Sequence, residues 1–425
     1  MKLFNQFFNS DIKGYKFFSL LFFSFLPISF IFGPSIINLN IILIDLLLII
    51  YSLNKKKWEW IRDGLFKSLI FLYLFLILNS ILAYYYKFSF SHEGIIRSLS
   101  FIKFILLIFA FKILIPNNYD LNKIIKFWLL IVSIFILDIF FEKIFGRNII
   151  GYTSLDQSRI ISFFKDELVV GTFVLCFGSL VFSFFLSKNN NNTEKFLLSI
   201  LLILIPLTIF ITGERANFIK SIFLFSFIII FIDNNKLFFN KKIILILLCV
   251  IITLLFIFNK TSKDKYSEIY TKLFIVENSS PVFIKFKDVK YIAHYDAAIE
   301  IFKNYPILGV GNKNFRTECK KEKYLNKNLI HSVERCTTHP HQVHFEILSE
   351  QGLIGYVIIF FIILRFIKKK LNYHWKNGQI FYLLNSLNLL LFLIPLLPGG
   401  GIFSTFNGSF FWIVFALTNL EYEKK

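Results

Sequence analysis

The chain has 425 residues, of which 56% are hydrophobic, 19% are aromatic and only 17% are charged. A water-soluble protein of this size cannot bury so large an apolar fraction, so the composition excludes an ordinary soluble domain and favours a membrane protein. The formal net charge of +20 suggests nucleic-acid binding, but the basic residues stand mainly between apolar runs. This distribution is typical of the connectors of a polytopic membrane protein, so we expect no nucleic acid among the partners.

Apolar runs close to the length of a membrane-spanning helix recur along the whole chain. They predict an all-α, polytopic membrane protein of about twelve transmembrane helices. In chain order, the predicted spans lie near residues 17–33, 36–53, 66–85, 98–115, 124–141, 168–187, 196–212, 217–232, 243–258, 343–366, 379–397 and 403–420.

The connectors that follow the even-numbered spans are rich in lysine. Lys57 follows the second span, Lys123 follows the fourth, Lys241 and Lys242 follow the eighth, and Lys368 follows the tenth. Cytoplasmic connectors of membrane proteins carry an excess of Lys and Arg. Both termini are therefore expected in the cytoplasm.

This orientation places one large hydrophilic segment on the outer side of the membrane. The chain then divides into nine spans within residues 1–258, a large outer loop over 259–342 and three further spans within 343–425. Inside the loop, residues 291–302 carry apolar side chains on one side of a helical pattern, which Pro306 ends. We expect this helix to pack on the membrane surface or on the ends of the spans.

Two clusters of charged residues lie on the outer side before the large loop. Arg215 stands beside Glu214 at the end of the seventh span. It either extends to the lipid headgroups or pairs with its acidic neighbour, or it clamps an anion, because a guanidinium group matches two phosphate oxygens. Arg159 and Glu167 lie with Lys165 just before the sixth span. A solvated loop explains this second cluster as well as a substrate site does.

The segment GVGNKNFR, residues 309–316, contains a GxG pattern. No strand and helix flank it in the manner of a dinucleotide site, so that interpretation is disfavoured. The glycines are better explained by a tight turn that presents Lys313 and Arg316.

Cys319 and Cys336 lie in the same outer loop, and we predict a disulfide bond between them. A bridge that closes a loop of this size contributes about 3 kcal/mol to stability. It would also bring Arg316 close to His341. Two free surface thiols are the alternative.

Three of the seven histidines, His339, His341 and His344, stand together at the start of the tenth span. Pro340 suits the first turn of a helix, with Thr338 or His339 as the cap. His341 would then lie in the first turn, with His344 on the same face. A helix N-terminus disfavours imidazolium and attracts anions, so we expect a neutral His341 that can act as a general base beside an anion.

Other interpretations of this segment remain open. The H-x-H-x-x-H spacing could bind zinc, or the histidines could only pack at the membrane interface. Glu350 follows nine residues after His341 and lies inside the tenth span. An acid in this position is a candidate site residue, or else it bridges to a neighbouring helix.

The motifs NYPILGVGNKNFR, THPHQVHFEILSEQGLIG and TGERANF together resemble those of the O-antigen ligase and polymerase superfamily. A large external loop before a span near the C-terminus agrees with the family. The family pattern of His-Asn, then Glu, then Gly-Leu-Ile-Gly corresponds to His341, Glu350 and Gly352 to Gly355, with Gln342 in place of the usual Asn. The segment RIISFFKDELVVG resembles an element of the polymerase branch.

This resemblance implies a metal-independent, membrane-embedded glycosyltransferase without a cofactor, in a bacterial inner membrane and with a periplasmic active site. The implied partners are glycans on undecaprenyl diphosphate, the lipid bilayer and a chain-length regulator. In the family, arginines hold the diphosphate leaving group and a histidine deprotonates the acceptor hydroxyl. Arg215 and His341 match these positions, and His339 and His344 would orient the base or contact the substrate.

The family's second arginine usually stands before the loop helix. The corresponding segment here, KFKDVKYIAHY, contains no arginine. Lys290, His294 and Arg316 are the candidates to replace it.

The resemblance favours a polymerase that joins lipid-linked repeat units of O-antigen or exopolysaccharide, because RIISFFKDELVVG and CTTHPH resemble that branch. The first alternative is an O-antigen ligase, which transfers glycan to lipid A-core. A flippase or transporter of lipid-linked sugar is the second, and it would require polar residues deep inside several spans. The predicted spans are nearly uncharged and the polar groups gather at one surface, which favours the enzyme.

Overall fold

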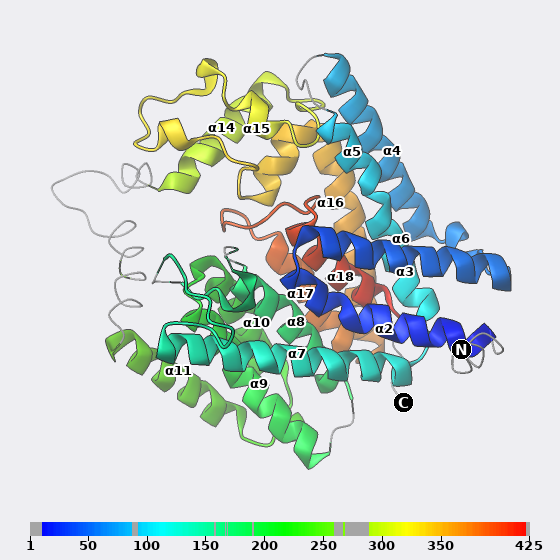
Figure 1. Ribbon diagram of the computed structural model, residues 1–425, viewed down its shortest axis with the longest axis vertical. Coiled ribbons are helices and arrows are strands. Elements are labelled where there is room, and N and C mark those ends of the chain that lie inside the picture. Colours follow the sequence, from blue (N-terminus) through cyan, green and yellow to red (C-terminus); the bar gives the residue numbers. More distant parts are fainter. Residues whose placement is uncertain are drawn as a thin grey trace.

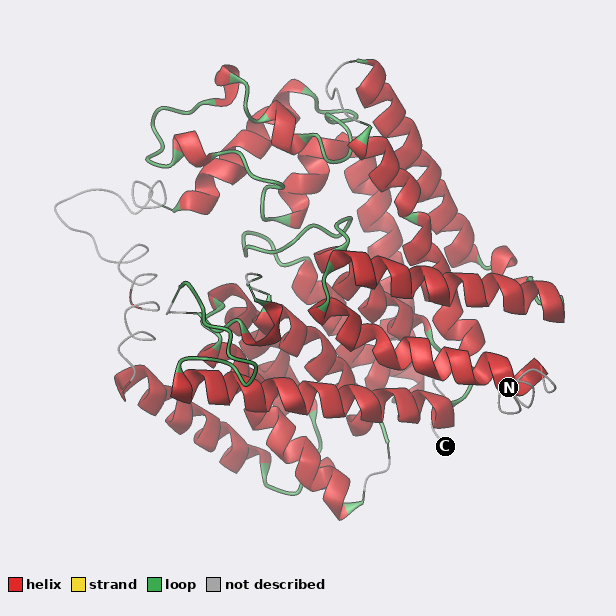
Figure 2. Cartoon of the chain, viewed as in Figure 1, coloured by secondary structure: helices red, strands yellow, loops and turns green. Residues whose placement is uncertain are grey.

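The computed structural model describes residues 11–86, 92–156, 159–165, 167, 169–188, 191–258, 267 and 289–421. Every regular element within these residues is helical, which confirms the predicted all-α class (Figures 1 and 2). The part of the large loop at 259–288 falls outside the described residues, except for Ser267.

Each of the twelve predicted apolar runs corresponds to a helix or to a pair of consecutive helices. They are α2 (Asp11–Ile31), α3 (Pro34–Lys55), α4 (Gly64–Tyr85), α5 (Glu93–Ser100) with α6 (Ile102–Leu114), α7 (Asn118–Phe145), α8 (Val170–Leu186), α9 (Asn192–Ile211), α10 (Arg215–Phe231), α11 (Lys241–Phe258), α16 (Val343–Asn377), α17 (Ile380–Phe392) and α18 (Phe406–Asn419). Among the described residues, seven helices are long and apolar enough to cross a membrane.

The two C-terminal apolar runs form shorter helices than predicted. α17 has 13 residues, so at 1.5 Å per residue it is only about 20 Å long, which is less than the thickness of a bilayer core. The connector from 393 to 405 completes this region without a helix, and its residues Ile402 and Phe403 are buried. Irregular backbone at such depth is tolerated where protein rather than lipid surrounds it.

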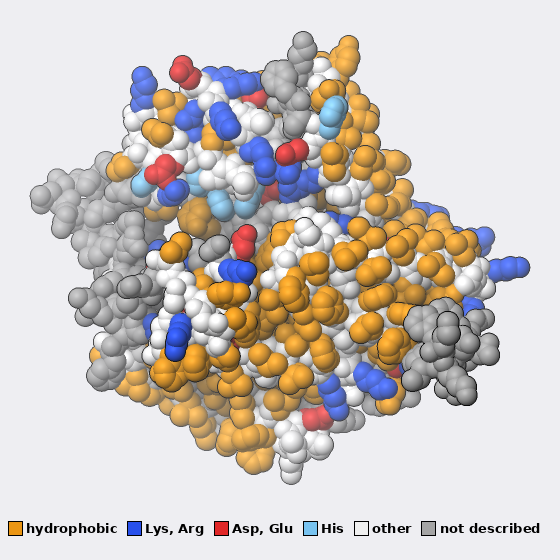
Figure 3. Space-filling view, viewed as in Figure 1, with side chains coloured by type: hydrophobic (Ala, Val, Ile, Leu, Met, Phe, Trp, Pro, Cys, Tyr) orange, Lys and Arg blue, Asp and Glu red, His pale blue; other side chains and the backbone are white. Residues whose placement is uncertain are grey.

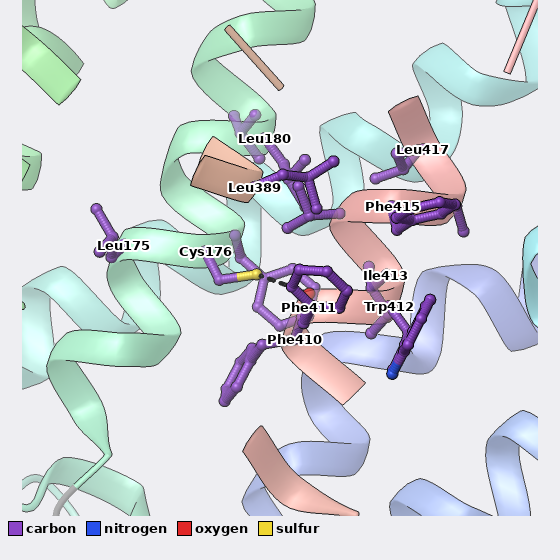
Figure 4. Close-up of a cluster of buried hydrophobic side chains, with 14 of the residues drawn as sticks. Leu175, Cys176, Leu180, Leu389, Phe410, Phe411, Trp412, Ile413, Phe415 and Leu417 are labelled. Carbon is purple, nitrogen blue, oxygen red and sulfur yellow. Dashed lines mark hydrogen bonds between the residues drawn. The ribbon is translucent and has the colours of Figure 1, made fainter. Parts of the chain in front are cut away.

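The interior where α8, α17 and α18 meet is filled with large apolar side chains (Figure 4). Phe410, Trp412 and Phe415 are almost completely buried, and the Cys176 thiol lies 3.8 Å from the Phe410 carbonyl. Because lipid is as apolar as these side chains, close packing rather than removal from water holds such helices together.

The connectors between the helices gather in two sets. In one set, Lys112 contacts Asp63 (Nζ–Oδ2 3.4 Å) and Glu421 (Nζ–Oε1 2.9 Å), which joins the ends of α6 and α18 to the start of α4. In the other set, the Ile160 amide donates to the Thr212 carbonyl at 3.3 Å. Figure 1 shows the helices of the large loop on the side of the bundle away from both termini.

The described part of the large loop forms a small cap with its own core. It contains α14 (Lys290–Asn304), α15 (Phe315–Glu318) and the short 3-10 helices η5 (Glu322–Tyr324) and η6 (Ser332–Glu334). The predicted loop helix is therefore confirmed as α14. Its buried face includes Tyr295 and Ala298, which belong to the predicted apolar side. It also includes His294 and Ile301, which do not, whereas Ile299 from the predicted side is exposed.

A break in α16 joins the cap to the bundle. Gly352 has a φ of 65° inside the helix, and a Cβ at this position would collide with the Ile307 carbonyl. The freed backbone groups bond instead to the segment after α14: the Val310 amide donates to Ser349, and the Leu353 amide donates to Pro306. The glycine therefore lets one loop pack directly against an unwound turn of α16.

Candidate active site

α16 begins at Val343, after His341 rather than before it. Its N-cap is Gln342, whose side-chain oxygen accepts hydrogen bonds from the amides of His344 (2.7 Å) and Phe345 (3.1 Å). The predicted cap at Thr338 or His339 and the placement of His341 in the first turn are therefore wrong. An amide side chain caps a helix start in the way that the family's usual Asn would.

His341 lies instead in a left-handed turn of the chain, with a φ of 59°. Its ring centroid is 4.3 Å from that of His339 and 5.4 Å from that of His294. We call these three residues the histidine cluster. Figure 3 shows histidine, lysine and arginine side chains together where the cap meets the helices below it.

His344 does not belong to this cluster. Its Nδ1 lies 2.9 Å from the Tyr356 hydroxyl and its Nε2 lies 2.8 Å from the Leu393 carbonyl, so both ring nitrogens have partners within the bundle. The predicted shared face with His341 is wrong, because the left-handed turn at His341 separates the two side chains. Among the described residues, no group of three or more His, Cys, Asp or Glu side chains is arranged to bind a metal ion.

The histidine cluster is held in the neutral state. Burial lowers the pKa of His341 to about 4, and the nearby His294 and Lys290 contribute to the shift. Burial likewise lowers the pKa of His339 to about 3, helped by His341 and by the charge of Arg97. The pKa of His294 is also lowered, mainly by burial. Neutrality agrees with the sequence prediction, but its cause is burial and neighbouring charge rather than a helix N-terminus.

Two arginines approach the histidine cluster from different elements. Arg316 of α15 donates to the Thr338 carbonyl at 3.4 Å, and Arg97 of α5 donates to the Phe403 carbonyl at 2.8 Å. The charges of both disfavour protonation of His339. Arg97 was not singled out from the sequence, although an arginine immediately before the fourth predicted span was a usable signal.

Glu93 connects this basic region to the cap. Its carboxylate lies 3.0 Å from Lys313 Nζ and 3.7 Å from Arg316 Nη1. As predicted, the glycine turn presents Lys313 and Arg316. Both side chains extend toward Glu93 at the start of α5.

Two buried carboxyl groups lie in the first part of α16. Glu350 accepts hydrogen bonds from the backbone amides of Lys313 (2.8 Å) and Phe315 (3.3 Å), so it holds the glycine turn of the cap. Glu346 was not singled out from the sequence. Its Oε2 has no hydrogen-bond partner among the described residues, and a Cβ added to Gly401 would collide with its carboxylate.

The three candidates to replace the family's second arginine have different surroundings. Lys290 forms an ion pair with Glu334. His294 is buried and its Nδ1 lies 3.1 Å from the Arg335 carbonyl. Only Arg316 extends its charge toward both Glu93 and the segment that contains His339.

The predicted disulfide is present in the structure. Cys319 and Cys336 are bonded, with their Cα atoms 5.5 Å apart. The bridge ties α15 to the segment that leads into the histidine cluster. Arg316 and Thr338 are thereby brought within hydrogen-bonding distance.

Arg215 is the first residue of α10, at the second charged region. The preceding Glu214 is buried, and its carboxylate accepts hydrogen bonds from the Gly171 amide (2.6 Å) and from Asn217. Arg159 interacts electrostatically with Glu214, whereas Glu167 is exposed. The structure thus brings Arg159 and Glu214 together next to Arg215.

One loop connects the two charged regions. The Gly399 amide donates to the His341 carbonyl at 2.7 Å. The same glycine lines a pocket that also contains Asn217 and Lys220 of α10. Lys220 was not singled out from the sequence, although a lysine near the start of an apolar span is a recognisable signal.

Comparison with known proteins agrees with these motifs. Residues 198–360, from α9 to the first half of α16, match the family model for O-antigen ligase. The chain carries an O-antigen ligase family domain. The resemblance inferred from the sequence is confirmed over this segment. No curated protein matches the chain.

The matched residues include only some of the charged side chains near the histidine cluster and Arg215. Arg215, Arg316 and His341 fall inside the matched residues, whereas Arg97 and Arg159 precede them. The α8, α17 and α18 helices, which pack around the pocket at Gly399, also lie outside the match. The N-terminal and C-terminal helices therefore add groups that the domain alone does not contain.

Proposed function

We propose that this protein is a membrane-embedded polymerase that joins glycan repeat units carried on undecaprenyl diphosphate. The observation that carries the proposal is the neutral histidine cluster beneath the cap, with Arg97 and Arg316 at its edge, in a chain with an O-antigen ligase family domain. A neutral imidazole beside fixed cations supplies a proton acceptor and an anion site together.

In the proposed reaction, His341 is the general base. A hydroxyl group of the acceptor glycan attacks the anomeric carbon of the donor sugar, and its proton passes to the His341 imidazole. The bond between that carbon and the diphosphate oxygen breaks, so undecaprenyl diphosphate leaves with the electron pair. Arg215 stabilises the negative charge that develops on the leaving group, as a bidentate clamp. His341 then releases its proton to solvent.

The pKa of about 4 would make His341 a weak base in the empty site. A bound diphosphate adds negative charge nearby, and negative charge raises the pKa of an imidazole. Donor binding would therefore increase the basicity of His341 at the time when a base is needed. His339 and His294 would keep the ring in position by their contacts with it.

The proposed orientation puts the site on the periplasmic face of a bacterial inner membrane. The lysine-rich connectors and both termini then lie in the cytoplasm, and the chain is organised as spans within 1–258, the cap within 259–342 and spans within 343–425. The separation of the connectors into two sets supports this arrangement. A reporter fused at Lys320 should give a periplasmic signal and one at Lys369 a cytoplasmic signal; the reverse pattern would overturn the orientation.

We favour polymerase over ligase because of the segments RIISFFKDELVVG and CTTHPH. Deletion of the gene, followed by electrophoresis of the surface polysaccharide, separates the two functions. Loss of a polymerase leaves a single repeat unit on the acceptor, whereas loss of a ligase leaves none. A complete ladder in the deletion strain would contradict both.

The purified protein provides the direct test. With lipid-linked donor in nanodiscs, a polymerase lengthens the glycan and releases undecaprenyl diphosphate. A flippase instead moves labelled lipid across proteoliposomes without lengthening it. Transport without glycan growth would replace our proposal with the flippase alternative.

A further inference from the structure

Lys220 is a buried cation that the proposed reaction does not use. It lies in the second turn of α10 with only 7% of its surface exposed. Within the described residues, its ammonium group forms no hydrogen bond and no ion pair. A buried, unpaired charge is costly, and a charged residue within an apolar helix is by default a candidate binding group.

The nearest acid is already occupied by other partners. The charge of Glu214 acts on Lys220, but the Glu214 carboxylate accepts hydrogen bonds from Gly171 and Asn217. The two side chains do not form a salt bridge in the structure. Glu214 therefore offsets part of the lysine charge without taking up its hydrogen-bond donors.

Lys220 opens into a pocket of about 60 Å³ that has no acidic lining residue. The polar groups of this pocket are hydroxyl and amide side chains and glycine backbone; they come from Thr172, Asn217, Asn388, Gly399, Gly400 and Asn407. A site of this size has room for several water-sized groups. One cation, several neutral polar groups and no carboxylate together suit an oxyanion.

The glycine-rich loop makes this pocket part of the histidine region. A Cβ added to Gly399 would lie 3.4 Å from Lys220 Nζ, so the ammonium group reaches this backbone. A Cβ added to Gly400 would collide with Asn407, so this side chain packs directly against the glycine backbone. Because the Gly399 amide donates to the His341 carbonyl, a single residue separates the lysine from the proposed base.

We propose that Lys220 and this pocket bind an oxyanion of the diphosphate leaving group, as a second anion contact beside Arg215. This inference rests on the proposed function, because it assumes a diphosphate-linked donor. Arg215 and Lys220 lie five residues apart in α10, about 7.5 Å along its axis and on different faces of the helix, so they would contact different oxygens of one diphosphate.

The test uses the full-length protein in nanodiscs and measures its affinity for sugar-free undecaprenyl diphosphate. Lys220→Met keeps an unbranched side chain that is one atom shorter and removes its charge, and we expect it to weaken binding by tenfold to a hundredfold. Binding of uncharged undecaprenol should not change. Lys241→Met, at the start of α11, is the matched control for removal of a lysine and should bind like the wild type.

Thermal unfolding separates a binding role from a structural one. If Lys220 binds the ligand, Lys220→Met should have an equal or higher midpoint without ligand, because an unpaired buried charge is removed. It should also lose the stabilisation that undecaprenyl diphosphate gives to the wild type. Unchanged affinity in Lys220→Met, or a wild type that does not bind the diphosphate lipid, would overturn the inference.

The assay contains neither a sugar nor an acceptor. A protein that binds the diphosphate lipid through Lys220 but does not lengthen glycans would contradict the proposed polymerase and leave the anion site intact. A protein that lengthens glycans while Lys220→Met binds normally would contradict the anion site alone.

Discussion

The two charged regions near the cap are constructed in different ways. The histidine cluster is held by irregular backbone: His341 sits in a left-handed turn, and His294 comes from a helix of the cap. In the α10 region, by contrast, Arg215 and Lys220 are fixed by consecutive turns of one helix. The position of the proposed base thus depends on contacts between distant segments, whereas that of the proposed anion clamp depends mainly on local helix geometry.

This difference has a mechanistic meaning. A diphosphate offers several equivalent oxygens, so a clamp on a helix can bind it in more than one orientation. A general base must face one acceptor hydroxyl within hydrogen-bonding distance, which requires tighter positioning. The disulfide, Glu350 and the break at Gly352 all stabilise the cap and the segment that contains His341. Substitutions in the two regions should therefore separate a loss of chemistry from a loss of positioning.

The largest effect should come from His341→Ala. Removal of a general base costs roughly 10²–10⁴-fold in rate, so polymer should become undetectable in the assay with purified protein and lipid-linked donor. Membrane insertion and the unfolding midpoint should stay close to wild type. His344→Ala is the matched control: it should lower the unfolding midpoint through its lost Tyr356 and Leu393 contacts, and reduce the rate less. Full activity of His341→Ala would remove this residue from the mechanism.

In the α10 region, Arg215→Lys should reduce the rate by about tenfold or more, because an ammonium group does not reproduce a bidentate guanidinium contact. The change keeps the charge, so the midpoint of thermal unfolding should move little. Polymer length and rate should be measured side by side. Wild-type values for both would show that Arg215 only anchors the helix at the membrane surface.

A third prediction concerns the disulfide bond that holds the segment leading to His341. Replacing Cys319 and Cys336 by Ser should destabilise the cap by about 2–5 kcal/mol, the usual range for loss of a native disulfide. Hydrogen exchange of the cap should increase, while that of α10 remains the same. Equal changes in both regions would contradict the independent support of the two sites.

Glu350→Gln should lower the stability of the cap without breaking a covalent bond. Glutamine keeps one acceptor oxygen but places an NH₂ group opposite a backbone amide of the glycine turn, so one of two buried donors loses its partner. Such a loss costs about 1–3 kcal/mol. Urea unfolding measures the loss of stability, and Glu300→Gln on the outer side of α14 is a suitable control with little expected effect.

A final prediction concerns the pH dependence of stability. The pKa values of His339 and His341 are lowered to about 3 and about 4, while unfolded histidine titrates near 6.5. Between these values the unfolded state binds more protons, so stability is full above about pH 6.5 and falls as the pH decreases toward 4. We expect a lower unfolding midpoint at about pH 5 than at about pH 7.5, and a smaller difference in His339→Gln. Identical slopes in the two proteins would exclude His339 as a cause.

Local patterns were sufficient for most of the fold. Apolar runs predicted the helices because each span must satisfy its backbone hydrogen bonds internally. A run of consecutive apolar residues in a membrane is therefore helical. The loop helix, its end before Pro306 and the pairing of Cys319 with Cys336 were also predictable. The shortness of α17 was missed, although Pro395 lies inside the predicted span and a helix usually ends at or before the residue that precedes a proline.

The site was only partly predictable, because it depends on contacts between segments that are distant in the sequence. The motifs identified His341, Arg215 and Glu350 as candidates, but the helix start was misplaced because Pro340 and Gln342 are both plausible near an N-terminus. Arg97 and Glu346 were overlooked. The position of Arg97 just before a span was a usable signal, but the partners of both residues, Phe403 and Gly401, are far away in the sequence.

The sequence by itself therefore determined the membrane class, the helical segments and the residue types available for glycan transfer, because hydropathy and motif spacing are local properties. Only the tertiary structure decided which of these residues meet. It separated His344 from His341, placed His294 beside the base and set Lys220 beneath Gly399. The physical reason is that the pKa values of the histidines and the partners of buried charges depend on burial and on neighbours from other segments, and these exist only once the chain is packed.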